Sequence, residues 1–314
     1  MLDVRGELGP QPAPDSALSG GEATQQLNFR ELTYRRFMAH PLAKWALLGF
    51  VAILVLCYGA PLWHLIAPNF IQTANQYTLG QANQPPSLAH LFGTDSLNGH
   101  DIFSLCLYGG ELSIFIGVGS MVVGIAMALI IGGASGFIGG PLDAVLMRIA
   151  DLYFSVPILL TVPLATKVFG HASPVTIAII FGIFSWPGPA RIVRSYMLSL
   201  REQQFTEAAR ALGVSNMRII YRHLLPNAVG PILVSFTLGV ATNIILEAFV
   251  SYLGFGLQPP TYSWGTVLSN SQQYLLSGNW WWTVFPGLCI VVTVLCINFI
   301  GDGLRDALDP RGLR

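Results

Sequence analysis

Long apolar runs recur along this chain, and several approach or exceed the roughly 18–20 residues that cross the hydrocarbon core of a bilayer. Apolar residues make up 53% of the sequence and charged residues only 10%. The pattern predicts an all-α integral membrane protein. Six transmembrane helices are expected at residues 44–66, 108–133, 147–168, 174–194, 229–250 and 282–302.

The distribution of positive charge predicts an orientation for these six spans. With a cytoplasmic N-terminus, an even number of spans returns the C-terminus to the cytoplasm. Of the 16 Lys and Arg residues, all but Lys167 then lie on the inner side or at an inner boundary. The reverse orientation would invert nearly every charge, so we expect both termini to be cytoplasmic.

The remaining segments divide into tails and loops. Residues 1–27 are rich in Pro, Gly, Gln and Ser and are expected to be disordered, within a cytoplasmic tail that spans 1–43. Residues 28–39 fit either a short helix on the membrane surface, ended by His40-Pro41, or a plain basic flank. Extracytoplasmic loops are expected at 67–107 and 251–281, and a cytoplasmic C-terminal tail at 303–314. The aromatic run Trp280–Trp282 is interpreted as interfacial anchoring.

Small residues and prolines shape the expected helix packing. A ridge of small side chains recurs at every fourth position of the second span and permits close approach of a neighbouring helix; it consists of Ser120, Gly124, Ala128, Gly132 and Gly136. The third span is interrupted by Pro157 and Pro163, and the fourth ends in Trp186-Pro187-Gly188-Pro189. Prolines bend helices, so these spans are expected to be kinked.

Residues 195–228 form a loop that is basic, patterned as helix and long for a link between adjacent spans. Good helix formers run from Gln203 to Leu212, Gly213 breaks the helix, and Ser215 can cap a second one, which Leu225-Pro226 would end. The prediction is a two-helix projection into the cytoplasm. Patterning alone leaves open whether it docks a partner or folds back on its own bundle.

The spacing of this loop resembles the EAA loop of ABC-importer permeases. The resemblance rests on Glu207-Ala208-Ala209, Gly213 and Leu225-Pro226, and His223 stands where the family pattern has Ile. Further stretches resemble dipeptide and oligopeptide permeases of the peptide/opine/nickel uptake family, C-type subunit, over roughly residues 90–310. They are Gly93-Thr94-Asp95, Gly99-His100-Asp101, Tyr108-Gly109-Gly110, Ser251–Gly256, Gln258–Pro260, Ser263–Gly265 and Asn298–Pro310.

The resemblance implies a type I ABC importer permease fold in a prokaryotic cytoplasmic (inner) membrane. The implied partners are a homologous permease in a heterodimer, two ATPase subunits and an extracytoplasmic binding protein, with no nucleic acid. The loop would be the coupling helix, through Glu207, Ala208, Ala209, Arg210, Gly213, His223, Leu225 and Pro226. The implied solute is a dipeptide or oligopeptide, with nickel or another small solute as the alternative.

The chain contains no GxxxxGK[ST] phosphate loop, so ATP and Mg²⁺ are expected only in the ATPase partners. We therefore expect no enzymatic activity and no bound cofactor or metal. An ATP-independent secondary transporter would need inverted repeats and intramembrane ion ligands, and no internal repeat is visible. An intramembrane protease built on Ser135 would need a His at the same depth, which the sequence does not provide.

Several polar or thiol side chains fall in or beside the spans. Glu247 either lines the pathway or outer gate or makes a structural hydrogen bond to a neighbouring helix, and the sequence leaves both open. Asp151 is expected to pair with Arg148 three residues away. In the first outer loop, a metal is not favoured at His90, Asp95, His100 and Asp101, because the two aspartates belong to the family's structural element. The four cysteines, Cys57, Cys106, Cys289 and Cys296, are expected to be free thiols.

Overall fold

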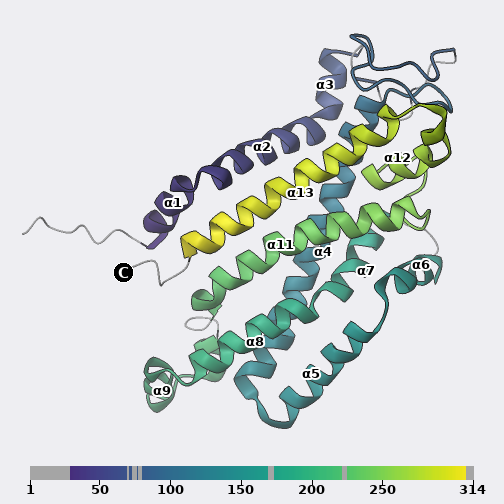
Figure 1. The fold of residues 1–314 in the computed structure, drawn as a ribbon. Helices are drawn as coiled ribbons and strands as arrows, with labels where there is room; N and C mark the ends of the chain where they lie inside the picture. Colours follow the sequence, from purple (N-terminus) through teal and green to yellow (C-terminus); the bar gives the residue numbers. More distant parts are fainter. Residues whose placement is uncertain are drawn as a thin grey trace, which may run out of the picture.

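The computed structural model describes residues 29–68, 71–72, 76, 80–168, 173–220 and 225–308, and within these ranges the regular elements are helices (Figure 1). The expected disordered tail, and the residues Asn28, His171 and His223, lie outside the described residues. The helices are α1 Phe29–Ala39, α2 Pro41–Tyr58, α3 Ala60–Ile66, α4 Ile102–Ile138, α5 Gly140–Ser155, α6 Ile158–Val168, α7 Pro174–Ser185, α8 Pro187–Arg201, α9 Gln204–Ala211, α10 Asn216–Ile219, α11 Leu225–Tyr252, α12 Trp264–Ser271, the 3₁₀ helix η2 Gln272–Ser277 and α13 Trp281–Leu308.

Four described helices, α2, α4, α11 and α13, are long and apolar enough to cross a membrane, and two bent pairs raise the number to six if each pair is one span. Each predicted span overlaps one of these helices or pairs. The α5–α6 pair bends by 88° and the α7–α8 pair by 46°. The difference follows from the residue before each proline. Val156, before Pro157, is extended, as proline favours, whereas Trp186, before Pro187, keeps a helical backbone.

Polar capping shifts the helix boundaries away from those predicted from apolar runs. The side chain of Asp101 caps α4 by accepting a hydrogen bond from the Ser104 amide at 2.8 Å, so the helix begins six residues before the predicted span. With 37 residues, α4 is about 55 Å long and extends beyond a bilayer core of about 30 Å. The first span is divided at Gly59 into α2 and α3.

The ridge of small residues on α4 packs as predicted. A Cβ atom built on Gly132 would lie 2.3 Å from the carbonyl oxygen of Ala190, and one on Gly136 would lie 2.6 Å from that of Arg194. A Cβ atom on Gly124 would lie 3.3 Å from the Cβ atom of Ser185. Glycine therefore brings the backbone of α4 against α8 and the end of α7, which lie beside it in Figure 1.

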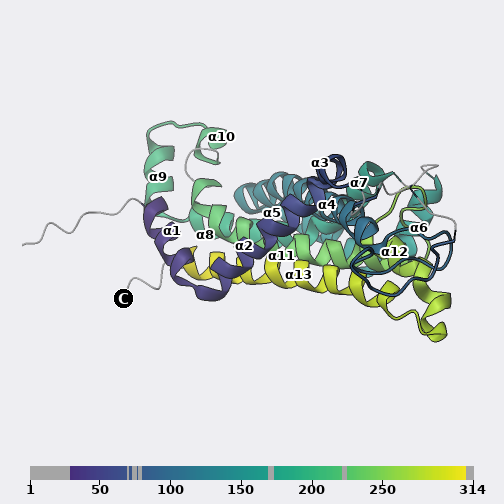
Figure 2. The same cartoon turned by 90° about the horizontal axis from the view of Figure 1, so that it is seen from above.

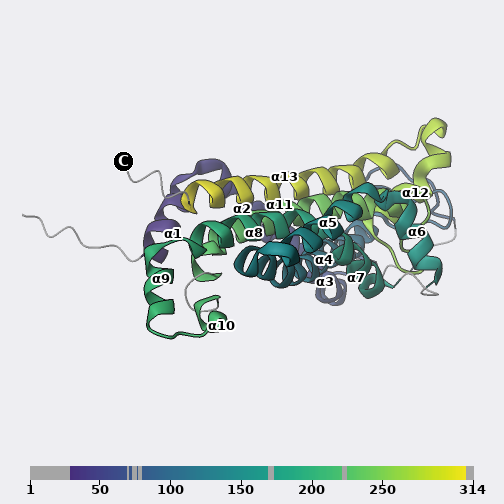
Figure 3. The ribbon, with the colours of Figure 1, turned by 90° about the horizontal axis from the view of Figure 1, so that it is seen from below.

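The two ends of the bundle carry different structures (Figures 2 and 3). Helices α9 and α10 lie at the end where α1 begins and α13 finishes, whereas α6 and α12 lie at the opposite end. The predicted short N-terminal helix is present as α1, which ends before His40-Pro41 and packs against α13.

The interpretation of Trp280–Trp282 as an interfacial anchor is wrong for two of the three residues. Trp281 and Trp282 are buried, and only Trp280 is exposed. The indole N–H of Trp281 donates to the Thr94 carbonyl at 3.2 Å, and the Trp282 ring stacks on Tyr274. The cause is tertiary: the 80–101 loop and η2 cover the start of α13, which a pattern of aromatic residues does not reveal.

Candidate functional site

The region that resembles the EAA loop forms two short helices, and we call residues 204–220 the knob. Helix α9 ends at Ala211, and Gly213 has φ +75°, in the left-handed region where glycine is unstrained. The predicted break at Gly213 is therefore present. The second helix is present as α10, Asn216–Ile219. Leu225-Pro226 begins α11 instead of ending α10, which corrects the prediction; proline fits the first turn of a helix, whose amides have no intrahelical acceptor.

The underside of the knob is anchored to the bundle. Thr206 is fully buried, and its hydroxyl donates to the Leu200 carbonyl at the end of α8 at 2.8 Å. Ile219 of α10 is also fully buried, in an apolar cluster with Phe137 of α4 and Met197 of α8. Ala209 and Val214 pack against the same cluster. The knob thus rests on the ends of α4 and α8, and this face does fold back on its own bundle.

The opposite face of the knob is open. Glu207, Ala208 and Gly213 are exposed, and a Cβ atom on Gly213 would meet nothing within 4 Å. Phe205 is 42% exposed and Leu212 83% exposed. Together these residues form an apolar surface beside one carboxylate. Of the other predicted loop residues, His223 lies outside the described residues, and Arg210, Leu225 and Pro226 are described by their helix positions alone.

Beside the knob, a carboxylate that the sequence did not single out joins three helices. Asp143 in the first turn of α5 accepts hydrogen bonds from Arg194 of α8, from Nε to Oδ1 at 2.5 Å and from Nη2 to Oδ2 at 2.6 Å. The hydroxyl of Ser135 on α4 also donates to Asp143 Oδ1. Ser135 is therefore engaged with a carboxylate and has no described His partner. An acidic residue directly after an apolar span was the available signal.

The predicted pairing of Asp151 with Arg148 is wrong. Asp151 instead accepts a hydrogen bond from Arg191 Nη2 of α8 at 2.5 Å. The Arg191 guanidinium also lies 4.5 Å from the centre of the Phe154 ring. The partner comes from a neighbouring helix, so sequence spacing along α5 could not identify it.

A cavity of about 1930 Å³ opens along α11. Its walls come from α1, α7, α8 and α13 as well, with Phe154 and Ile158 from the α5–α6 bend. The lining is mainly apolar. Among the described residues that line it there is no Asp, Glu, His or Cys, and Arg305 is the charged residue. Its polar side chains include Ser185, Ser235, Thr242 and Asn243.

Asn243, a polar residue inside α11, ties this helix to two neighbouring helices. Asn243 Nδ2 donates to Ser120 of α4 at 2.8 Å, and Ser185 of α7 donates to Asn243 Oδ1 at 3.1 Å. The sequence interpretation missed Asn243, although an amide inside an apolar span is a recognisable signal.

Glu247 is fully buried and does not line the cavity. Ser113 of α4 donates to its Oε2 at 2.9 Å, and Ser251 donates to its Oε1 at 2.7 Å. The hydrogen bond to a neighbouring helix, one of the two interpretations left open, is therefore present. A role of Glu247 in the pathway or gate stays a prediction.

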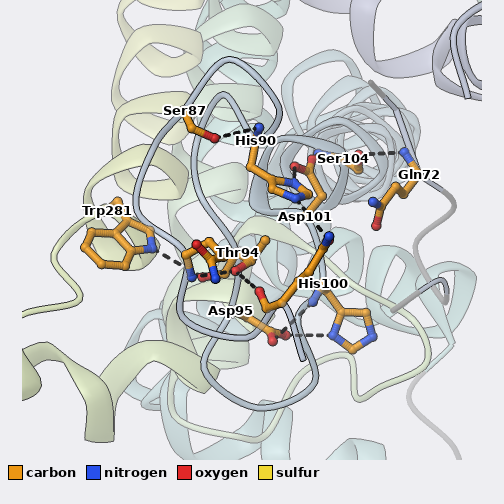
Figure 4. A network of polar contacts seen from close by, with 11 residues as sticks. Gln72, Ser87, His90, Thr94, Asp95, His100, Asp101, Ser104 and Trp281 are labelled. Carbon is orange, nitrogen blue, oxygen red and sulfur yellow. Dashed lines mark hydrogen bonds and ion pairs between the residues drawn. The ribbon is translucent and has the colours of Figure 1, made fainter. Parts of the chain in front are cut away.

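At the end opposite the knob, two His–Asp pairs organise the 80–101 loop (Figure 4). Asp95 Oδ1 accepts hydrogen bonds from the backbone amides of residues 97–100 at 2.7–3.2 Å, and its Oδ2 pairs with His100 Nδ1 at 2.6 Å. His90 Nδ1 pairs separately with Asp101 Oδ2 at 3.0 Å. Over the described ranges, no three His, Cys, Asp or Glu side chains are grouped to hold a metal ion.

The electrostatics of Asp95 explain why this loop is ordered around it. Burial raises the pKa of this carboxyl, but the hydrogen bonds from His100 and from the amides of Asn98 and Gly99 outweigh burial and lower the pKa below its ordinary value. Gly93 makes a second contribution, because a Cβ atom there would lie 2.6 Å from the Gln84 carbonyl oxygen and 2.8 Å from the Trp281 ring. These residues act on the shape of the loop.

Comparison with known proteins identifies a family and relatives that this chain resembles. The model of the family described as "Binding-protein-dependent transport system inner membrane component" matches residues 114–313. The chain is 36% identical over 285 residues to the dipeptide transport system permease protein DppC of Bacillus subtilis (strain 168), covering 91% of this chain and 87% of that protein. It is 41% identical to the oligopeptide transport system permease protein OppC of the same strain, with 88% of each chain covered. Against the glutathione transport system permease protein GsiD of Escherichia coli O6:K15:H31 (strain 536 / UPEC) it is 41% identical, covering 88% of this chain and 89% of that protein.

Among solved structures, a chain from the inward-facing MetNI methionine ABC transporter matches with a TM-score of 0.53 and 21% sequence identity. The match covers 65% of this chain and 96% of that chain. At this level of identity the likeness shows a shared fold.

Proposed function

This chain belongs to the family of inner membrane components of binding-protein-dependent transport systems, and we propose that it moves dipeptides or oligopeptides into the cell as a permease subunit of an ATP-driven importer. The observation that carries the proposal is the knob, whose anchored underside and open apolar face suit a docking element. Relatives that carry peptide permease names over about nine-tenths of this chain support the solute class.

In the proposed orientation the knob end of the bundle faces the cytoplasm. Of the 16 Lys and Arg residues, all but Lys167 are distributed as this orientation requires. The start of α1 and the end of α13 lie at the knob end, which supports cytoplasmic placement of both termini. The opposite end, with the 80–101 loop and α12, would then lie on the extracytoplasmic side of a prokaryotic inner membrane, where it would face an extracytoplasmic binding protein.

The knob would couple this chain to an ATPase subunit. Ala208 and Gly213 have minimal side chains and allow a partner surface to approach closely, while Phe205 and Leu212 offer apolar area. Glu207 supplies a charge for a polar contact, together with Arg210 and the segment from His223 to Pro226. ATP and Mg²⁺ would be bound and used by two ATPase partners, so this chain needs no catalytic group of its own.

The cavity along α11 would form this subunit's half of the translocation pathway, closed on its open side by a homologous permease. Its lining favours a peptide over nickel as the solute. Nickel and related cations prefer imidazole, carboxylate or thiolate ligands, and the described lining offers none of them. An apolar wall with a few hydroxyl and amide groups instead suits peptide backbones and varied side chains.

The test is peptide uptake and ATP hydrolysis in proteoliposomes that contain the whole transporter. Glu207→Ala should lower uptake about tenfold, as expected for loss of one charged contact at an interface. Glu202→Ala is the matched control, because Glu202 is an exposed carboxylate just before α9, and its uptake should stay within about twofold. Gly213→Pro should abolish coupling. If assembly and uptake survive both Glu207→Ala and Gly213→Pro, the knob is not the coupling element; uptake without ATP would indicate a secondary carrier.

A further inference from the structure

Three helices converge on one carboxylate at the knob end of the bundle. Asp143 of α5 binds Arg194 of α8 through both carboxylate oxygens and also accepts the Ser135 hydroxyl of α4. Ser135 is fully buried, Asp143 is 17% exposed and Arg194 is 32% exposed. A two-point pairing of a planar guanidinium with a carboxylate resists rotation and sliding of the two helices more than a single hydrogen bond does.

The same two helices are joined by a second ion pair of a different kind. Arg191 and Asp151 also connect α8 to α5, but by one hydrogen bond, and their side chains are 46% and 53% exposed. Exposed pairs of this kind contribute little to stability. No described contact of Asp151 reaches α4, so Asp143 is distinguished by fixing three helices at one point.

The Asp143 cluster is next to the anchored underside of the knob. Phe137 lies two residues beyond Ser135 on α4, and Met197 lies one turn beyond Arg194 on α8; both pack around the buried Ile219 of the knob. Arg201 Nη1 adds a hydrogen bond to the Phe137 carbonyl at 3.4 Å. The last two turns of α8 therefore contact the knob on one side and Asp143 on the other.

Close backbone packing keeps the ends of α4 and α8 from shifting relative to each other. Gly136 of α4 is so close to α8 that a Cβ atom would lie 2.6 Å from the Arg194 carbonyl oxygen. Close-packed backbones move together, so a movement of the knob carries the ends of α4 and α8 with it. At its far end α5 meets α6 in the 88° bend, where Phe154 and Ile158 line the cavity.

We propose that Asp143, Arg194 and Ser135 form a relay that transmits movement of the knob to α5 and so to the cavity wall at the α5–α6 bend. This relay rests on the proposed function of the knob as the ATPase-coupling element. The three residues contact neither solute nor nucleotide in this scheme; they are positioning residues. Their removal should change how much uptake each ATP hydrolysed produces.

The experiment measures peptide uptake and ATP hydrolysis in the same proteoliposomes, with the whole transporter. Asp143→Asn keeps the size of the side chain and removes the charge, and uptake per ATP should fall about tenfold. Arg194→Lys keeps the charge but loses the two-point geometry, and the same ratio should fall. Asp151→Asn, the matched control on the same helix, should stay within about twofold of the unchanged protein. Exchanging the pair, Asp143→Arg with Arg194→Asp, should recover at least part of the ratio.

The outcomes separate the relay from the proposed function. If Glu207→Ala lowers uptake per ATP and Asp143→Asn and Arg194→Lys do not, the relay is wrong and the coupling knob stands. If Glu207→Ala and Gly213→Pro leave the ratio unchanged as well, the knob is not the coupling element, and the proposed function of the knob fails. If the Asp143 and Arg194 variants only reduce the yield or melting temperature of the complex while uptake per ATP is kept, or if the exchange recovers nothing, the pair is a structural contact and the relay is overturned.

Discussion

Replacing one of two adjacent glycines on α4 tests the helix contact on which the knob rests. A Cβ atom at Gly132 would lie 2.3 Å from the Ala190 carbonyl oxygen and 3.0 Å from the Ala190 Cα atom, both of them backbone atoms of α8. A Cβ atom at Gly133 would meet nothing within 4 Å. The two positions belong to the same helix and differ in what an added methyl group contacts.

The structure sets the size of the expected difference. Gly→Ala inside a helix is favourable by roughly 1 kcal/mol, and this gain applies equally at both positions. At Gly132 the helices would have to separate by about 1 Å to reach an ordinary contact distance. Overpacking of this kind costs about 1–3 kcal/mol, and a backbone neighbour cannot rotate away. Gly133→Ala should therefore be neutral or stabilising, and Gly132→Ala should be less stable than Gly133→Ala by at least 1 kcal/mol.

The assay is the apparent melting temperature of the purified transporter in detergent, with one substituted position at a time. We expect Gly132→Ala to melt several degrees below Gly133→Ala, because each 1 kcal/mol shifts a chain of this size by about 2–4 °C. Gly132→Ser also adds a Cβ atom at this position, so its melting temperature should be lowered as in Gly132→Ala. Equal melting temperatures for the alanine variants at 132 and 133 would refute the close contact between α4 and α8.

Two further predictions concern buried carboxylates at other places. Glu247→Ala should destabilise the protein by about 1–3 kcal/mol, because the buried hydroxyls of Ser113 and Ser251 lose their acceptor. Glu247→Gln should cost less stability, because its amide oxygen still accepts a hydrogen bond. Thermal unfolding compares the two variants, and equal stabilities would contradict the prediction. Asp95 has a folded pKa below the ordinary 3.8, so its contribution to loop stability is complete above about pH 4 and is lost as the pH falls through the folded pKa. Limited proteolysis measures the protection of the 80–101 loop as the pH is lowered below about pH 4. In the unchanged protein the protection should decline on acidification, and in Asp95→Asn it should be weak at every pH. Identical pH profiles for the two proteins would contradict the prediction.

The sequence predicts features of this molecule that local chemistry determines. Apolar length identifies the spans, the proline after Val156 marks the bend of the third span, and Gly213 marks the break in the knob. Each of these depends on residues close together in the chain. The predicted end of the second knob helix at Leu225-Pro226 fails because proline fits the start of a helix as well as the residues after its end, and sequence alone does not choose between them.

Features that depend on contacts between distant segments escape the sequence interpretation. Asp151 takes its partner from α8, 40 residues away, instead of from its own helix. Trp281 is covered by the 80–101 loop and hydrogen-bonds to a residue 187 positions away. Asp143, Arg194 and Asn243 were missed for the same reason: single polar residues beside or inside apolar runs show that a partner is needed, and only the fold shows which one.

The distribution of close and loose packing indicates where this subunit can change shape. Along α4 the glycine ridge brings backbones of α7 and α8 into direct contact, and Asp143 adds α5 at the knob end, so these helices resist relative motion. Along α11 the side facing the cavity is open, with about 1930 Å³ unfilled. Between these regions lie the two proline breaks, at Val156-Pro157 and Trp186-Pro187, with residues 154, 158 and 187–189 on the cavity wall. Because α4 holds both α7 and α8, a push on the knob that α4 and α8 carry rigidly must be accommodated at the other break, Val156-Pro157, where Phe154 and Ile158 border the cavity.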